Sequence, residues 1–335
     1  MPLDSNPSRR RSVLSLLGRW AFVVGAAGVT AAVGAQVFPD RPLRIVVPFP
    51  AGGIVDVTAR KVGQKLAEDL GRPVIIDNRP GAGGTIGTEF VARSPADGHT
   101  LLMVFDTHAV NPLIYPGLKY DTFKDFAAVS LVGKVPLVFA TYPKAPFNDL
   151  QGFVALARKS PGTLSYASVG AGSSGHLLME QLKMLSRIDV LHVPFKGGAP
   201  ALSALMGEQS DLLVFAAGAA VPLIQHGKIK ALALTGERRS TTLPAVPTTA
   251  EAGFAQLDSG AWMGLVAPAA TPRPVIDRLQ RSVAKAVSDP AVVSSLKAQA
   301  VDLQASTPSE FDAFVFAEHK RWSQLIAKAN LDLRQ

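Results

Sequence analysis

Two glycine-rich segments of the chain combine residue types that could bind an anion. Residues 48–60, PFPAGGIVDVTAR, follow the apolar run LRIVV and precede apolar residues at helical spacing. A glycine joint between a strand and a helix leaves main-chain N–H groups at the positive end of the helix dipole. Residues 168–175, SVGAGSSG, have a similar layout. The chemistry that these segments predict is recognition of a phosphate or a carboxylate.

Sequence patterns for catalysis and cofactor binding are missing. The chain has no cysteine, which excludes disulfides, thiolate catalysis and cysteine–zinc sites. Residues 172–176, GSSGH, have the wrong spacing for a nucleophile elbow, and the histidines form no metal-binding pattern. There is no P-loop pattern, and Ile86 stands where a dinucleotide fingerprint needs its third glycine. We therefore predict no cofactor, no metal and no enzyme, with a hydrolase or isomerase as the alternative.

Several candidate residues also have purely structural explanations. Asp56 could complement the helix dipole in the first turn, and Lys196 could attract an anion or lie along the surface. Ser173 and Ser174 could cap the helix that follows them. Capping and ligand contact are compatible, because both place the hydroxyl at the helix N-terminus.

Apolar periodicity places these loops in repeated units of strand, loop and helix. Residues 43–47 form an expected buried strand, and apolar residues three or four positions apart predict a helix that ends at Gly71. The pattern recurs with an expected strand at 164–168 and an expected helix at 176–185. We expect two α/β lobes whose Gly/Ser loops lie at the carboxyl ends of strands, where open α/β sheets bind ligands.

The expected lobes share the chain unevenly. Two apolar, β-rich segments are interpreted as crossings between the lobes, and the capping box that begins at Thr307 opens a long final helix that we expect on lobe 1. The predicted division is residues 1–35 as a signal peptide, 36–136 plus 266–335 as lobe 1, 137–265 as lobe 2, and crossings near 129–142 and 261–268.

The N-terminal residues have the layout of a signal peptide. Arg9, Arg10 and Arg11 precede an uncharged segment, 20–35, that is rich in Ala, Val and Gly. Both the Sec and the twin-arginine export routes stay open, and a retained membrane anchor is the alternative. Residues 1–35 hold four arginines and one aspartate, so their removal lowers the net charge from +8 to about +5. The basic residues are scattered, which argues against a nucleic-acid partner.

The motifs of residues 38–330 resemble one family, the solute receptors of tripartite tricarboxylate transporters, also called Bug receptors after the Bordetella uptake genes. The matching segments are FPDRPLRIVVPFPAGG at 38–53, NRPGAGGTIG at 78–87, PADGHTLL at 95–102, THAVNP at 107–112, YASVGAGSS at 166–174, HVPFKGGAP at 192–200, LPAVPT at 243–248 and GLVAP at 264–268.

The resemblance implies a periplasmic binding protein-like II fold, the two-lobed "Venus flytrap", with a mainly parallel sheet flanked by helices in each lobe. It implies a periplasmic receptor, expected to be a monomer, that closes on a small carboxylate and delivers it to membrane permease subunits. A ligand sensor for a signalling system is the alternative. Carried over by position, the ligand contacts would be Phe49, Ala51, Gly52, Gly53, Asp56, Gly84, Thr85 and Thr107 from lobe 1, and Ser168, Gly170, Ser173, Ser174, Lys196, Gly197 and Gly198 from lobe 2.

Two positions depart from the family pattern. Phe215 occupies a position where many members have Asp, which favours a ligand with an apolar or aromatic body if the ring faces the ligand. The alternative is that Phe215 points into the core and another residue selects the ligand. Asp106 stands where small polar residues are common, and it would disfavour a second carboxylate if it faces the pocket.

Overall fold

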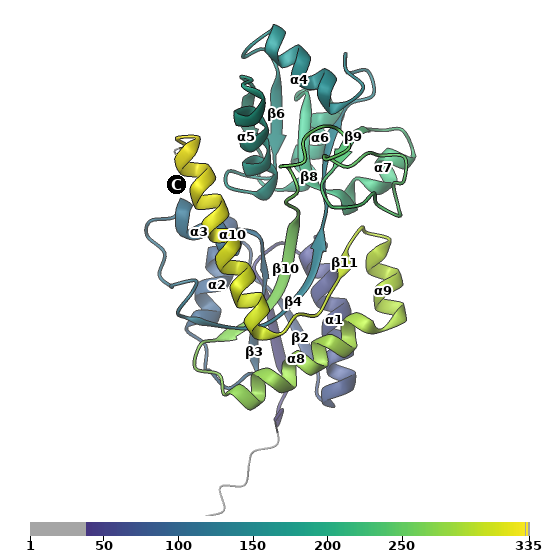
Figure 1. The fold of residues 1–335 in the computed structure, drawn as a ribbon. Coiled ribbons are helices and arrows are strands. Elements are labelled where there is room, and N and C mark those ends of the chain that lie inside the picture. Colours follow the sequence, from purple (N-terminus) through teal and green to yellow (C-terminus); the bar gives the residue numbers. More distant parts are fainter. Residues whose placement is uncertain (1–37, 332, 334–335) are drawn as a thin grey trace, which may run out of the picture. The chain divides into compact units, whose positions relative to one another are not determined.

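The computed structural model describes residues 38–331 and residue 333, and the expected signal peptide lies outside this part of the chain. The described residues from Arg41 onward form one compact unit. Two lobes, each built on its own sheet, make up the compact unit (Figure 1). Among the described residues, no helix combines the length and the apolar character that a membrane crossing needs.

Lobe 1 is built on a six-stranded sheet with the strand order β11-β4-β10-β3-β1-β2. β1 runs parallel to β2 and β3, whereas β10 runs antiparallel to β3 and β4. The apolar side chains of β1 are fully buried, as in a strand covered on both faces. The strands are β1 (Leu43–Val47), β2 (Val74–Asn78), β3 (Thr100–Phe105), β4 (Phe126–Val135), β10 (Ala261–Pro268) and β11 (Asp302–Leu303).

Helices cover both faces of this sheet. Val91 of α2, Ala109 of α3 and Phe311 of α10 pack into one apolar cluster. On the opposite face, Gly63 lets α1 approach the side chain of Ile45. The helices of lobe 1 are α1 (Ile54–Leu70), α2 (Thr85–Ala92), α3 (Thr107–Ile114), α8 (Arg273–Ser288), α9 (Pro290–Lys297) and α10 (Pro308–Lys328), and a short 3₁₀ helix, η1 (Ala82–Gly84), precedes α2.

A carboxylate near the C-terminal end of α1 fixes this helix against α8. Asp69 accepts hydrogen bonds from Lys285 Nζ at 2.6 Å, Ser282 Oγ at 2.7 Å and Arg278 Nη1 at 2.6 Å. These donors hold the pKa of Asp69 well below its ordinary value. The network anchors α1, and therefore also the loop that joins α1 to β1.

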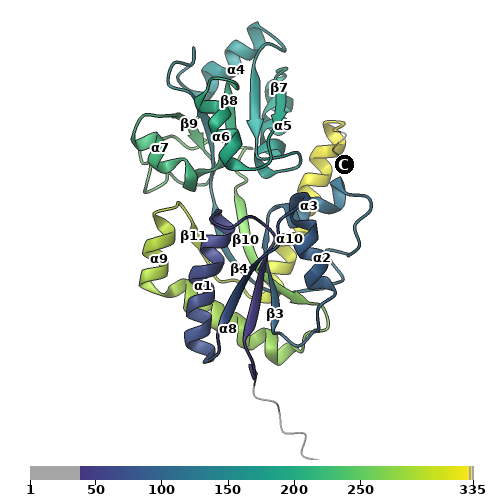
Figure 2. The same cartoon turned by 180° about the vertical axis from the view of Figure 1, so that it is seen from behind.

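Lobe 2 forms the upper half of the view in Figure 2, where β7, β8 and β9 are labelled. Its five-stranded sheet has the strand order β7-β6-β8-β5-β9. β6 runs parallel to β7 and β8, whereas β5 runs antiparallel to β8 and β9. The strands are β5 (Leu137–Thr141), β6 (Ser165–Ser168), β7 (Leu191–Pro194), β8 (Leu212–Ala216) and β9 (Lys230–Leu234). The helices are α4 (Leu150–Lys159), α5 (Ser174–Ser186), α6 (Gly198–Met206) and α7 (Val221–Gln225), with the 3₁₀ helix η2 (Ala217–Ala219) before α7.

The chain passes from lobe 1 to lobe 2 at Pro136, between β4 and β5, and it returns between β9 and β10. The two expected α/β lobes are confirmed, but their sheets are mixed rather than mainly parallel, because β10 and β5 enter antiparallel to their neighbours. β10 lies wholly in the sheet of lobe 1. The topology therefore favours a lobe boundary near residue 260 over the expected one at 265.

Candidate functional site

The loop between β1 and α1 ends in a helix N-terminus that no side chain caps. Ala51, Gly52 and Gly53 are exposed, and Phe49 is half-buried beside them. Gly52 has a φ of 82°, a conformation that favours glycine. The loop therefore presents exposed main chain at the positive end of the α1 dipole, as the sequence predicts.

Asp56 shapes this loop from within. Its carboxylate accepts hydrogen bonds from Gly52 N, Arg60 Nε and Asn78 Nδ2, each at 2.9 Å. Burial acts to raise the pKa of Asp56, but the hydrogen bonds from Arg60, Gly52 and Asn78 outweigh it and hold the pKa below its ordinary value. Asn78 Nδ2 also donates to Phe49 O at 3.2 Å. Asp56 is only 2% exposed, so the structure supports a positioning role for this residue.

The other predicted residues of lobe 1 lie close to this loop. Gly84 begins α2 with a φ of 94° and no side-chain cap, and a Cβ added there would lie 3.4 Å from Phe49 Cζ. Thr85 follows it in the first turn of α2 and is half-buried. Thr107, the first residue of α3, is half-buried and lies two residues after Phe105. The ring of Phe105 packs edge-on against Phe49, and the two ring centroids are 5.7 Å apart. The carboxyl ends of β1, β2 and β3 thus gather the predicted residues at one edge of the sheet.

In lobe 2 the loop after β6 is held by its own serines. Ser168 Oγ donates to Gly170 O at 3.0 Å, and Ser173 Oγ donates to the same carbonyl at 2.7 Å. Ser173 also caps α5 by accepting from His176 N at 3.4 Å. Gly172 N donates to His176 Nδ1 at 2.9 Å. The capping explanation is therefore confirmed for Ser173, and Ser168 is fully buried.

A serine–histidine contact beneath this loop invites the hydrolase alternative. Ser168 Oγ and His192 Nε2 lie 2.8 Å apart, and the His192 ring stacks against both Tyr166 and His176. Burial lowers the pKa of His192 to about 4, so the ring is neutral at neutral pH. Ser168 has no exposed surface, and its hydroxyl already hydrogen-bonds within the loop. A substrate cannot reach this hydroxyl, so the contact supports a structural role.

The segment after β7 leads into a helix N-terminus that could bind an anion, as the N-termini of α1 and α2 could in lobe 1. We call these three helix N-termini the anion seats. Lys196 is exposed, and among the described residues it forms no hydrogen bond or ion pair. Gly197 has a φ of 112° and begins α6 with no side-chain cap. Gly198 follows as the first residue of the helix. An exposed cation therefore stands beside an uncapped helix N-terminus.

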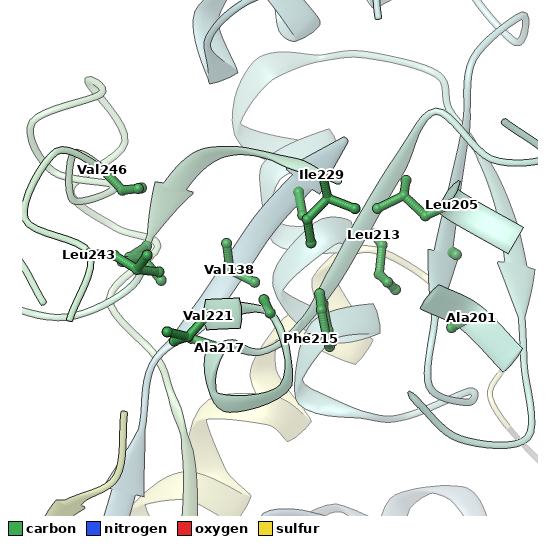
Figure 3. Close-up of a cluster of buried hydrophobic side chains, with 14 residues drawn as sticks. Val138, Ala201, Leu205, Leu213, Phe215, Ala217, Val221, Ile229, Leu243 and Val246 are labelled. Carbon is green, nitrogen blue, oxygen red and sulfur yellow. The ribbon is translucent and has the colours of Figure 1, made fainter. Parts of the chain in front are cut away.

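Phe215 lies in the core of lobe 2. It is 4% exposed and belongs to a cluster of buried apolar side chains that includes Val138, Leu213 and Ala217 (Figure 3). On β8 it alternates with Val214, whose carbonyl faces Gly175 of α5. The alternative given by the sequence, a Phe215 that points into the core, is the one that the structure supports. The preference for an aromatic ligand loses its basis.

The two lobes also touch each other directly. Val110 and Ile114 of α3 pack with Leu177 of α5 and Trp322 of α10 in one buried cluster. Gly172 makes this possible, because a Cβ at that position would overlap Ile114 Cδ1. Asp106, one turn before Val110, is 3% exposed. The sequence carried a signal for this contact, since Asp106, Val110 and Ile114 are spaced four residues apart.

Comparison with known proteins identifies the family. Residues 58–331 match the family described as "Tripartite tricarboxylate transporter family receptor". The chain belongs to this family. Protein BugT of Bordetella pertussis is 35% identical over 95% of this chain and 98% of its own length. The expectation from the sequence motifs is thereby confirmed.

Solved structures of the family share the fold. One is "R. palustris Rpa4515 with adipate", with a TM-score of 0.82, 32% identity, and coverage of 88% of this chain and 98% of that one. Another is MatC (Rpa3494) from Rhodopseudomonas palustris with bound malate, with a TM-score of 0.76, 33% identity, and coverage of 86% and 100%. The periplasmic binding protein fold is confirmed, and members of this family are solute-binding receptors rather than enzymes.

Proposed function

We propose that this receptor closes on a small aliphatic carboxylate, which the N-termini of α1 and α2 in lobe 1 and of α6 in lobe 2 hold. The two solved relatives contain adipate and malate, both small dicarboxylates. The ligand contacts proposed are Phe49, Ala51, Gly52 and Gly53 at α1, Gly84 and Thr85 at α2, Thr107 at the start of α3, and Lys196, Gly197 and Gly198 at α6. All of them except the buried Gly84 are exposed or half-buried.

The observation that carries this proposal is the difference between capped and uncapped helices. α4, α5, α9 and α10 each begin at an Asp, Ser or Thr whose side chain accepts a hydrogen bond from the first turn. α1, α2 and α6 also have no side-chain cap, and each begins at a glycine. α3, α7 and α8 lack a side-chain cap too, but they begin at other residues. At α2 the Thr85 N–H already donates to Ala82 O, so the later N–H groups of its first turn are the ones available. A helix N-terminus without a cap leaves N–H donors for another acceptor, and an anion is the acceptor that the dipole favours.

Two of the glycines are not required by the fold. Gly53 has a φ of −73°, and a Cβ there would meet its nearest atom, Pro50 O, at 3.5 Å. Gly198 has no positive φ, and a Cβ there would meet only Val169 Cγ1, at 4.0 Å. Any small side chain would fit at both positions, and at Gly53 an Asp or Ser would cap the helix at least as well. Close approach of a ligand to the main chain explains glycine at both.

The energetics suit reversible capture. Hydrogen bonds to a charged group contribute about 1.5–3 kcal/mol each. Two to four such bonds, less the cost of closing the lobes, correspond to roughly −8 kcal/mol, or micromolar affinity. Such an affinity allows capture and release without chemistry.

The wider setting of the receptor forms part of the proposal. Export by a signal peptide at residues 1–35 would bring the chain to the periplasm, where a monomer would deliver its ligand to the permease subunits of a tripartite transporter. The charge and motif pattern that suggested export lies outside the described residues. No residue that the structure describes favours the sensor alternative over transport, so the transporter assignment follows the family.

A binding screen tests the proposal. Thermal shift followed by calorimetry with adipate, malate, citrate, glutamate and benzoate should reveal micromolar binding of an aliphatic carboxylate. Gly53→Val should abolish that binding without unfolding the protein, because the side chain blocks ligand approach, while its Cβ makes only an ordinary contact of 3.5 Å with Pro50 O. Gly117→Val, at a glycine with no neighbouring atom within 4 Å, is the matched control. Wild-type affinity in Gly53→Val, or binding of neutral solutes alone, would contradict the proposal.

A further inference from the structure

Asp106 is the polar end of the contact between α3 and α5. It precedes Val110 and Ile114 by one and two helical turns, so the three side chains lie on the same side of α3. Val110 and Ile114 pack against Leu177 of α5. The hydroxyl of Ser174, in the first turn of α5, lies beside the Asp106 carboxyl. The carboxyl of lobe 1 is therefore covered by the helix of lobe 2.

The Asp106 carboxyl is buried, but no described residue donates a well-aligned hydrogen bond to it. Asp106 is 3% exposed, and neither of its oxygens accepts a well-aligned hydrogen bond from a described residue. The Ser174 hydroxyl and the Thr107 N–H lie near enough to offset part of the burial. Burial of an ionised carboxylate in such a place costs far more free energy than burial of a neutral carboxyl.

The groups around Asp106 do not supply a compensating positive charge. Glu318 of α10 lies near Asp106, and its negative charge disfavours the ionised form of Asp106. The positive charges of Lys134 and Arg321 interact with Glu318 and favour its ionised form. His108 on α3 and His176 on α5 are buried, and burial lowers their pKa values to about 4 and about 3, so both are neutral. Burial, with a smaller contribution from Glu318, raises the pKa of Asp106 to about 7.

We infer that closure of α3 against α5 takes up a proton at Asp106, so that ligand binding by this receptor is coupled to protonation. The inference rests on the proposed function, because lobe closure is what buries Asp106. When the lobes separate, water reaches the carboxyl and its pKa returns toward the ordinary value of about 4. Between about pH 4 and pH 7, the closed form therefore binds a proton at Asp106 that the open form releases.

The sign of the effect follows from this difference. Below about pH 4 the carboxyl is neutral in both forms, and above about pH 8 it is ionised in both, so affinity is flat at both ends. Between them the closed form is protonated and the open form is not, so affinity falls as pH rises. From pH 6 to pH 8 the expected loss is about tenfold. Ligand carboxyls are already ionised over this interval.

Calorimetry in two buffers of different ionisation enthalpy measures the proton directly. The probes are adipate and malate, titrated at pH 6.5 into the wild-type protein, Asp106→Asn and Glu318→Gln. We expect wild type to take up more than about half a proton per ligand and Asp106→Asn to take up none. Glu318→Gln should keep the uptake, which distinguishes Asp106 from the other buried carboxyl.

Three results would overturn the inference: no uptake in wild type, equal uptake in Asp106→Asn, or an uptake lost in Glu318→Gln alone. If no carboxylate binds at any pH, the proposed function fails. If adipate or malate binds without proton uptake, the proposed function stands and the inference alone fails. With saturating ligand, which holds the lobes closed, urea denaturation should show Asp106→Asn gaining stability over wild type as pH rises from 5 to 8.

Discussion

The junction of β1 with α1 and the junction of β3 with α3 each carry a buried aspartate, and the two aspartates have opposite environments. Asp56 accepts hydrogen bonds from three groups, and its pKa lies below the ordinary value. Asp106 accepts no well-aligned hydrogen bond from a described residue, and its pKa is raised to about 7. The two junctions touch through Phe49 and Phe105.

The difference separates permanent structure from a changeable contact. The partners of Asp56 all belong to lobe 1, so its network persists whether the lobes are open or closed. The cover over Asp106 includes Ser174 of lobe 2, so its environment changes when the lobes move. A carboxylate with complete hydrogen bonding shapes a loop, whereas one without it responds to closure.

Loss of the Asp56 carboxylate should have the largest effect. Asp56→Ala removes the acceptor of the Gly52 N–H and of the half-buried Asn78 amide. Each hydrogen bond to a charged group contributes about 1.5–3 kcal/mol, so we expect a loss of about 3–4 kcal/mol in the free energy of unfolding. Arg60 is half exposed and contributes little of this. Urea denaturation at pH 7 measures the loss. A change below about 1 kcal/mol would show that the network does not hold the loop.

The pH dependence of the two aspartates should have opposite signs. The contribution of Asp56 is present above the unfolded-state pKa of about 4 and disappears as pH falls through its lowered native pKa. In the closed form, with saturating adipate or malate, the neutral form of Asp106 stabilises the fold below about pH 4, and this contribution is lost as pH rises from there through about 7. With that ligand present, the free energy of unfolding of Asp106→Asn should therefore exceed that of wild type by roughly 3–4 kcal/mol at pH 8 and by little at pH 4. If the free energy of unfolding of Asp106→Asn and that of wild type changed with pH in parallel, Asp56 and Asp106 would not differ in the way proposed.

A methyl group at Gly172 should disturb the contact between α3 and α5 that buries Asp106. In Gly172→Ala the added methyl group overlaps Ile114 of the other lobe, and the alanine has to adopt a φ of 73°. We therefore expect the free energy of unfolding to fall by roughly 1–2 kcal/mol. Gly71→Ala is the matched control, because Gly71 has a φ of 67° and open space around it. Scattering should show a larger radius of gyration for Gly172→Ala alone. Equal behaviour of the two variants would mean that backbone strain, not the contact between lobes, accounts for the effect.

The smallest effect concerns the contact that joins the two junctions. Phe105→Leu removes the edge-on packing against Phe49 and should cost roughly 0.5–1.5 kcal/mol. A double-mutant cycle with Phe49→Leu, followed by thermal unfolding, isolates the coupling between the rings. Additive effects of the two substitutions would show that the junctions are independent.

Local sequence signals were sufficient for most elements of the fold. The strand LRIVV is observed at the expected residues, and the capping box at Thr307 opens α10 as predicted. The glycine joints at Gly53 and Gly197 begin helices, because a glycine after a buried strand favours the turn that the helix needs. These features depend on neighbours within a few residues, so periodicity and capping rules could find them.

Features that depend on distant pairing could not be predicted in this way. The antiparallel entry of β10 is set by β3 and β4, which lie more than a hundred residues earlier in the chain. The segment LLVFA of β8 is apolar on both faces, so its sequence does not show that Phe215 faces the core. The burial of Asp106 depends on α5, and the roles of Asp56 and Asp106 diverge only once their partners are known.

The central claim is that helix N-termini without side-chain caps hold the carboxylate of the ligand. Calorimetry with the tightest-binding carboxylate of the screen should compare wild type, Gly53→Asp and Gly117→Asp. An aspartate at position 53 caps α1 and fills the anion seat with its own charge, so the account predicts stability unchanged or raised by a few tenths of a kcal/mol. It also predicts at least about a thirtyfold loss of affinity, equivalent to about 2 kcal/mol, and wild-type affinity for Gly117→Asp. Wild-type affinity in Gly53→Asp would contradict the claim.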